Sequence, residues 1–191
     1  MKRTFYICLI ILCIAVLSLS ITACNRTEPS ELSDDLDSLM FSLNGVVHTL
    51  PVPFSELMDK GWGGFYGHVI APYGRSANVG IRNGNQVLTV HFTNLTGNEM
   101  PLNESYIDGF FIPYGSEAQV TLPGDITRGT PYDEVIATHG EPNGRPEDNE
   151  TVLLRYYRDY VRAFMRVNTE TNLVISMNFS MTDVAVARAG R

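Results

Sequence analysis

The sequence predicts an α+β fold of two loosely repeated units, each a short helix packed on an antiparallel β-sheet, preceded by a signal peptide and a flexible tether. Alternating apolar and polar residues recur between turn residues, which is typical of half-buried strands. Each half also holds one short helical pattern that begins at a proline and ends at a glycine. The predicted boundaries are 1–23 for the signal peptide, 24–39 for the tether, 40–115 for the first unit and 116–191 for the second.

The chain begins with the layout of a secretory signal peptide. A positively charged start at Lys2 and Arg3 precedes an almost unbroken apolar run over residues 5–21, as such peptides require. The following Ile21-Thr22-Ala23-Cys24 resembles the lipobox of bacterial lipoproteins, whose cysteine is diacylated on sulfur and becomes the new N-terminus after cleavage. The alternative is an uncleaved anchor, because the run lies at the short end of the roughly 17 to 25 residues that span a bilayer. The small residues before Cys24 favour cleavage.

The lipoprotein interpretation fixes the expected location. Diacylglycerol on Cys24 would attach the protein to the outer side of the cell membrane, so we expect an extracytoplasmic, lipid-anchored protein. Cys8 and Cys13 lie in the segment that would be removed. The mature chain would then use its single cysteine for lipid and contain no disulfide.

The net charge argues against one class of partner. Loss of Lys2 and Arg3 reduces the 14 basic residues to 12 against 21 acidic ones, which gives a mature charge of −9. Nucleic acid binding requires clustered Lys and Arg for phosphate contacts. We therefore expect no nucleic acid partner.

The first unit follows a polar, acidic tether over residues 24–39. Asn44-Gly45 between apolar residues predicts a tight hairpin, because both central positions of a type I′ turn need positive φ. A short helix is expected from Pro53 to the stop at Gly61. A second hairpin is predicted over residues 79–92 and a further strand over residues 106–112.

The second unit repeats this order. A strand near residues 119–122 precedes Thr130, which we expect to cap a helix over residues 131–139 with Val135 and Ile136 facing inward. Gly140 ends this helix. The shared order of strand, proline-initiated helix and strands indicates a loose internal duplication.

Three strands are predicted at the C-terminal end, over residues 152–157, 160–167 and 173–180. Their alternation predicts one buried face, with Leu173, Ile175, Met177 and Phe179 on the core side of the last strand. A two-residue turn would place Arg155 directly opposite Arg162. The other face carries a candidate interaction surface of arginine and aromatic residues, the types enriched at interaction hot spots: Arg155, Tyr157, Tyr160, Arg162, Phe164 and Arg166. Alternatively, these arginines pair with Asp or Glu of the same chain, or the first unit covers the face.

One segment carries a family resemblance. Leu122-Pro123-Gly124-Asp125-Ile126-Thr127-Arg128-Gly129-Thr130-Pro131, followed by Val135-Ile136, His139-Gly140-Glu141-Pro142 and a three-stranded meander, resembles the outer-membrane assembly lipoproteins of the BamE (SmpA/OmlA) type. It is similar also to the repeats of β-lactamase inhibitory protein. Together with Leu43-Asn44-Gly45 and Gly61-Trp62, it resembles lipoproteins of Gram-positive bacteria. His139 stands where this pattern has an aromatic or aliphatic residue. The resemblance implies a non-enzymatic module that presents a sheet or loops to another protein, and it carries no catalytic residue.

The residues give little support to catalysis. The four histidines are scattered, so we expect no metal site and no cofactor. The sequence contains neither a Gly-x-Ser-x-Gly elbow nor a Ser-x-x-Lys motif. We therefore expect no enzyme.

Two functions remain open. The first is a non-catalytic protein-interaction module of the cell envelope that binds an envelope protein. The second is an extracytoplasmic lipoprotein that holds a small molecule or cell-wall fragment between the two units. The second function requires a concave, largely apolar pocket with a few convergent polar groups at the junction of the units.

Overall fold

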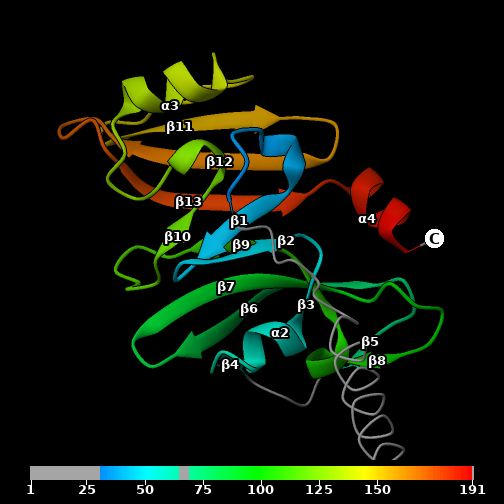
Figure 1. Ribbon diagram of the computed structural model, residues 1–191. Helices are drawn as coiled ribbons and strands as arrows, with labels where there is room; N and C mark the ends of the chain where they lie inside the picture. The colour runs from blue at the N-terminus through cyan, green and yellow to red at the C-terminus, as the bar shows by residue number, and fades with distance from the viewer. Residues whose placement is uncertain (1–30, 65–68, 191) are drawn as a thin grey trace, which may run out of the picture.

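The computed structural model describes residues 31–64 and 69–190. The predicted signal peptide, Cys24 and the first part of the predicted tether lie outside these residues. The described chain is a mixed α and β structure dominated by antiparallel sheets, with a few short helices (Figure 1). Within the described ranges, no helix is long and apolar enough to cross a membrane.

An eight-stranded antiparallel sheet organises the molecule. Its strands follow the order β11-β12-β13-β9-β7-β6-β4, and β3 pairs with β9 beside this path. The strands are β3 (Val52–Pro53), β4 (Gly63–Gly64), β6 (Arg75–Asn83), β7 (Gln86–Thr93), β9 (Tyr106–Ile112), β11 (Thr151–Tyr157), β12 (Val161–Asn168) and β13 (Val174–Met181). Because β13 pairs with β9, strands of both predicted units form one continuous sheet.

Two small sheets and several short helices complete the fold. One sheet joins β10 (Val120–Thr121), β1 (Met40–Leu43) and β2 (Val46–Thr49), and the other joins β5 (Val69–Ile70) and β8 (Met100–Pro101). The α-helices are α2 (Phe54–Met58), α3 (Tyr132–His139) and α4 (Asp183–Ala189), and the 3-10 helices are η1 (Leu36–Ser38), η2 (Leu102–Glu104) and η3 (Pro123–Asp125).

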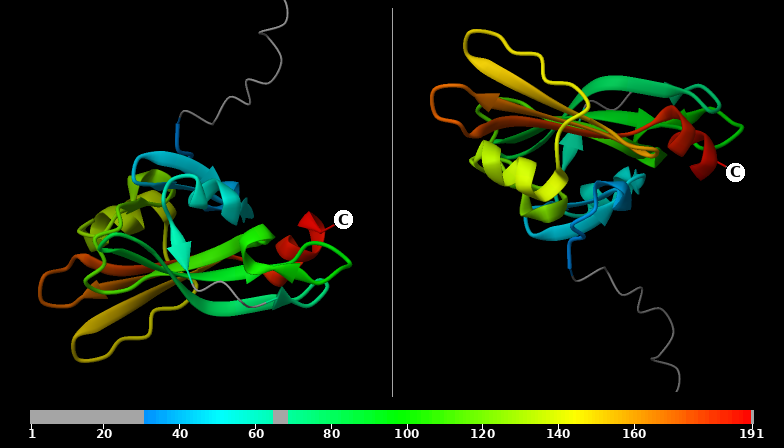
Figure 2. Two further views of the ribbon diagram at one scale, coloured as in Figure 1. Left: turned by 90° about the horizontal axis from the view of Figure 1, so that it is seen from below. Right: turned by 90° about the horizontal axis from the view of Figure 1, so that it is seen from above.

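The large sheet is covered on one side. Strands β1 and β2 and helix α3 lie over the same side of this sheet (Figure 2). Phe41 of β1 contacts Phe110 of β9 with ring centroids 4.7 Å apart, and Phe54 of α2 meets Phe92 of β7 at 5.0 Å. These contacts place the hydrophobic core between the sheet and the elements above it. We call the opposite side of the large sheet the open face, because no described helix lies over it in Figure 2.

Local sequence signals predict most elements correctly. The hairpin at Asn44-Gly45 is confirmed, since β1 and β2 pair and both turn residues have positive φ. The hairpin of β6 and β7 turns at Gly84, also with positive φ. Helices α2 and α3 form where the proline and glycine signals place them.

The tether boundary and one helix cap need correction. Leu36, inside the predicted tether, is buried, and Asp35 caps η1 by accepting a hydrogen bond from Asp37 N. The ordered chain therefore begins before residue 40, because an apolar side chain of this segment reaches the core. The N-cap of α3 is Pro131 and not Thr130, whose hydroxyl instead accepts a hydrogen bond from Thr127 N at 2.9 Å.

The predicted faces of β11 and β12 are correct, but their register is wrong. Arg155 pairs with Phe164, and Arg162 pairs with Tyr157. The cause is a turn displaced by one residue: Arg158 N donates a hydrogen bond to Val161 O at 3.0 Å, which leaves Asp159 and Tyr160 as the two turn residues. The two arginines are thus kept apart, which avoids the unfavourable pairing of like charges across strands.

Strand β13 departs from prediction at its start. The register between β12 and β13 shifts between Arg166 and Val167, so Val174 pairs with Val167 and is buried. Leu173, predicted to face the core, lies outside the strand and is 36% exposed. The extra residue of this bulge is Ile175, which has no partner on β12 and is half-buried instead of facing the core as predicted. Beyond it, Met177 and Phe179 are buried as predicted.

Candidate functional site

The predicted interaction residues are placed by the pairing of the strands. Arg155, Phe164, Asn178 and Phe111 form one row across β11, β12, β13 and β9. Tyr157, Arg162, Ser180, Gly109 and His91 form the next row. Tyr160 precedes β12 and belongs to neither row. The central carbon of the Arg188 guanidinium, on α4, lies 5.0 Å from the centre of the Tyr160 ring. The same guanidinium donates a hydrogen bond to the Tyr160 hydroxyl.

Aromatic side chains remain accessible on the open face. Tyr157 and Phe164 meet edge to face with centroids 5.6 Å apart, and Tyr157 is 46% exposed. Phe111 is 36% exposed in the same row as Phe164. The guanidinium of Arg155 forms no ion pair with any described residue.

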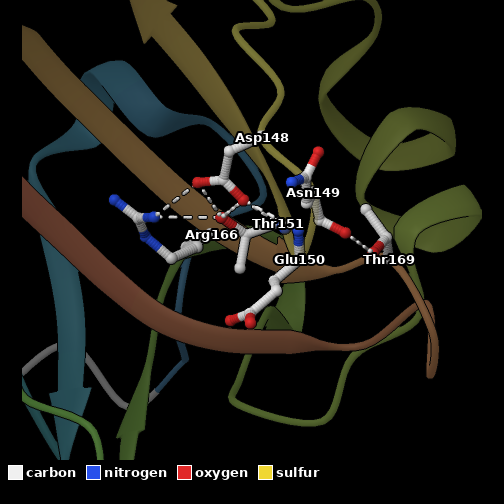
Figure 3. Close-up of polar contacts among 6 residues, drawn as sticks. All are labelled: Asp148, Asn149, Glu150, Thr151, Arg166 and Thr169. Carbon is white, nitrogen blue, oxygen red and sulfur yellow. Dashed lines mark hydrogen bonds and ion pairs between the residues drawn. The ribbon is translucent and has the colours of Figure 1, made fainter.

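The other two arginines of this surface pair within the chain. Arg166 Nη1 donates a hydrogen bond to Thr151 Oγ1 at 2.9 Å and lies 3.6 Å from Asp148 Oδ2 (Figure 3). Arg162 Nη2 lies 3.7 Å from Asp183 Oδ2. The expectation that the arginines pair with acidic residues of the same chain is therefore confirmed for these two.

The loop before β11 explains the position of Asp148. Its Oδ1 accepts hydrogen bonds from the backbone N–H groups of Glu150 at 2.9 Å and Thr151 at 2.7 Å. These hydrogen bonds lower the pKa of the Asp148 carboxyl, because they stabilise its charged form. A fixed negative charge then holds Arg166 against the sheet (Figure 3).

A hollow of about 540 Å³ lies between α4 and two turns of the first half of the chain. Figure 1 shows α4 at the same end of the sheet as β5 and β8. We call this hollow the junction groove, because both predicted units contribute to it. Its lining residues are Tyr73, Arg75, Asn94, Leu95, Asp183, Val186, Ala187 and Gly190.

The walls of the junction groove are fixed by hydrogen bonds. The buried Asn94 side chain donates to the carbonyl oxygens of Ile70, Ala71 and Asn98 and accepts from Thr96 N. Helix α4 begins at Thr182, whose hydroxyl accepts from Ala185 N at 3.3 Å. Both walls are thus built before any ligand arrives.

A chain of charges runs along one side of the groove. Arg75 Nε lies 2.6 Å from Asp108 Oδ2, and Arg75 Nη1 lies 2.6 Å from Asp183 Oδ1. Asp183 in turn contacts Arg162. The order is therefore Asp108, Arg75, Asp183, Arg162, with alternating sign.

Asp108 is buried completely in β9. It occupies a register shift, since His91 pairs with Gly109 while Phe92 pairs with Ile107. Burial raises the pKa of the Asp108 carboxyl, and the Arg75 guanidinium opposes that rise. A buried carboxylate of this kind needs a cationic partner, which Arg75 supplies.

A second hollow of about 250 Å³ also has Arg75 in its lining. We call it the arginine hollow; it is lined by Arg75, Ser76, His91, Arg162, Ser180 and Met181. Burial lowers the pKa of His91, the neighbouring Arg75 lowers it further, and Asp108 acts in the opposite direction. The two hollows share Arg75, which also pairs with Asp183 in the lining of the junction groove.

Sequence reasoning identified Arg162 but not the rest of this site. Arg75, Asp108 and Asp183 are far apart in the chain and carry no motif. One signal was available: Asp108 is a charged residue within the otherwise apolar strand of residues 106–112. Such a residue indicates a bulge or a paired buried charge.

Among residues 31–64 and 69–190, no group of three or more His, Cys, Asp or Glu side chains could hold a metal ion. Comparisons with protein-family models, with curated proteins and with solved structures give no match. The geometry of the junction groove and of the open face is therefore the basis for a functional proposal.

Proposed function

We propose that the protein is a lipid-anchored, extracytoplasmic lipoprotein that binds a small molecule in the junction groove and catalyses no reaction. The observation that carries this proposal is the groove itself. Its volume of about 540 Å³ falls in the usual range for ligand sites, roughly 300 to 1,000 Å³. It offers aliphatic side chains of Leu95, Val186 and Ala187 beside one polar pair, Arg75 and Asp183.

The N-terminal sequence supports the location. Cys24 follows an apolar run and two small residues, as the lipobox pattern requires. A diacylated cysteine would keep the binding domain close to the membrane surface, because two acyl chains anchor far more firmly than one. A tethered binding protein would meet small molecules that leave or approach the membrane.

Methyl NMR of the full chain in lipid nanodiscs tests the binding proposal. The probe is 1-hexanol, a neutral molecule with a short apolar chain, and empty nanodiscs control for partition into the lipid. We expect saturable shifts of the Leu95 and Val186 methyl signals, since both side chains line the groove. Shifts spread over the surface without saturation would contradict the proposal.

Two matched variants of α4 sharpen the test. Ala187→Trp adds a bulky side chain inside the groove and should abolish the shifts. Val184→Trp adds the same side chain at a residue that is 57% exposed and outside the lining, so it should leave them unchanged. Equal binding by both variants would place the ligand elsewhere.

A second candidate function is a non-catalytic protein-interaction module, favoured by the accessible aromatic residues of the open face. Tyr157, Phe164 and Phe111 offer an apolar strip beside Arg155, which forms no ion pair with any residue that the structure describes. The partner that fits is an envelope protein with an apolar ridge and an acidic group at its border. Aromatic and arginine side chains are the usual anchors of such contacts.

Site-specific photocrosslinking in the native host tests this second candidate. A crosslinker at Tyr157 should capture one defined envelope protein, and Phe164→Ala should abolish the capture. A crosslinker at Tyr114, which is 84% exposed and lies outside these rows, is the control. Identical products from both positions would remove the support for this function.

We propose in addition that the two halves descend from a duplication of a unit similar to the BamE and β-lactamase inhibitory protein folds. Each half supplies one short helix followed by three long antiparallel strands. These are α2 with β6, β7 and β9 in the first half, and α3 with β11, β12 and β13 in the second. This shared order supports the proposal.

A further inference from the structure

We infer that the junction groove selects an anionic amphiphile, a molecule with one carboxylate or phosphate head on an apolar chain. The acidic head group of this ligand takes the place of the Asp183 carboxylate between Arg75 and Arg162. The apolar tail of the ligand lies in the junction groove. This inference rests on the proposed binding function and adds the chemical class of the ligand.

Asp183 already shows how an anion fits this place. One of its oxygens lies 2.6 Å from Arg75 Nη1 and the other 3.7 Å from Arg162 Nη2. Its side chain is 73% exposed, whereas those of Arg75 and Arg162 are 31% and 43% exposed. Exposed ion pairs contribute little to stability, so an external anion can compete with Asp183 for the two guanidinium groups.

The arginine hollow provides room for the head. It brings hydroxyl groups of Ser76 and Ser180 and the His91 ring to the same space as the two arginines. Hydroxyl and guanidinium groups donate hydrogen bonds to oxyanions, and arginine does so in a two-pronged geometry. The donors needed for a carboxylate or a phosphate therefore converge beside Asp183.

The balance of charge favours one negative head. The buried Asp108 carboxylate contacts Arg75 Nε and offsets the positive charge of that guanidinium. If Asp183 moves away, Arg162 loses the acidic group that it contacts, while Arg75 keeps Asp108. A single anionic group restores neutrality at this place.

The apolar tail of the ligand would lie in the junction groove. Arg75 lines both hollows, and Asp183, which contacts Arg75, lines the junction groove. The same groove presents Leu95, Val186 and Ala187. A ligand whose acidic head group is bound by Arg75 and Arg162 thus places its apolar tail against these aliphatic side chains.

The first experiment compares hexanoate with 1-hexanol in the same nanodisc preparation, with the Leu95 and Val186 methyl signals as the readout. The two probes have the same chain length and differ in the charge of the head. We expect hexanoate to bind about tenfold more tightly, because hydrogen bonds to charged groups contribute more than neutral ones. Equal affinity for both probes would overturn the inference, although binding of 1-hexanol would still support the groove as a ligand site. If neither probe binds, the proposed binding function is overturned as well.

Three variants test the role of Asp183 directly. Asp183→Asn removes the internal competitor, so it should raise the affinity for hexanoate several-fold and leave that for 1-hexanol unchanged. Arg162→Gln should lower the affinity for hexanoate alone. Arg155→Gln is the matched control, since Arg155 lies on the same sheet and lines neither hollow. A weaker binding of hexanoate by Asp183→Asn, with 1-hexanol unaffected, would contradict the exchange.

One outcome needs a second measurement. If Asp183→Asn also fails to bind 1-hexanol, the substitution has disrupted the groove. The inference is then tested by comparing the affinity for hexanoate of Arg162→Gln with that of Arg155→Gln. Nanodiscs of neutral and of anionic phospholipid then distinguish the source of the head. Competition by the anionic bilayer identifies a membrane lipid, and its absence identifies a soluble acid or phosphate ester; both results keep the same chemistry.

Discussion

Arg75 Nε lies 2.6 Å from Oδ2 of Asp108, a carboxylate that is fully buried in β9. This ion pair connects β6 with β9 across the intervening strand β7. It also fixes the guanidinium that lines both the junction groove and the arginine hollow. The position of a binding residue is thus set by a buried charge beneath it.

Asp108→Asn should change how stability depends on pH. Because burial raises the pKa of Asp108 in the folded state, folding increases its affinity for a proton. The stability that it contributes is present below the ordinary carboxyl pKa of about 4 and is lost as pH rises through the raised value. The free energy of unfolding of the wild type, relative to Asp108→Asn, should therefore fall as the pH rises above about 4. Urea denaturation at several pH values measures it, and a constant difference would contradict the burial argument.

Gly109→Ala should destabilise the junction of the two halves. A Cβ at this position would lie 2.4 Å from the Cβ and 2.8 Å from the Cα of Ser180 on β13. To relieve this steric clash, β9 and β13 must move apart, which should lower the free energy of unfolding by roughly 1 to 3 kcal/mol. Gly80→Ala is the matched control, since a Cβ there meets no atom within 4 Å. Chemical denaturation of both variants should show a large loss for Gly109→Ala only.

His139→Phe should make the protein less sensitive to acid. Burial lowers the pKa of His139, as does Arg158, whereas a hydrogen bond to the Pro123 carbonyl and the charges of Asp34 and Asp35 oppose the shift. A lowered histidine pKa contributes stability above the ordinary value of about 6.5 that is lost as pH falls below it. The thermal midpoint of the wild type should therefore decrease more steeply between about pH 7 and pH 5 than that of the variant. Parallel curves would show that His139 does not couple to folding.

Cys24→Ala should abolish membrane attachment. We expect the wild-type chain from host membranes to begin at Cys24 and to carry added acyl mass, which intact mass spectrometry detects. The variant should lack that mass and leave the membrane fraction. A wild-type chain of unmodified mass would contradict the lipoprotein assignment.

The sequence predicted those features that neighbouring residues determine. The turn at Asn44-Gly45 needs only two residues of positive φ, and α3 needs only a proline start and a glycine stop. Alternation along β11 and β12 also revealed which face is buried. These signals are local, so a single sequence was sufficient.

Register and the candidate site depend on distant residues. The pairing of Arg155 with Phe164 follows from a turn that lies one residue later in the chain than expected, at Asp159 and Tyr160. The contact of Arg162 with Asp183 requires the path of β13 into α4, and that of Arg75 with Asp108 requires a register shift between β7 and β9. No spacing in the sequence encodes these contacts, because each joins elements that meet only in the folded chain.

The most direct test of the central claim is native mass spectrometry of the full chain released from membranes of its own host. We predict a retained small molecule with one acidic group, present in the wild type and in Val184→Trp and missing from Ala187→Trp. The same molecule retained by Ala187→Trp, or a wild-type chain that carries no small molecule, would contradict binding in the junction groove.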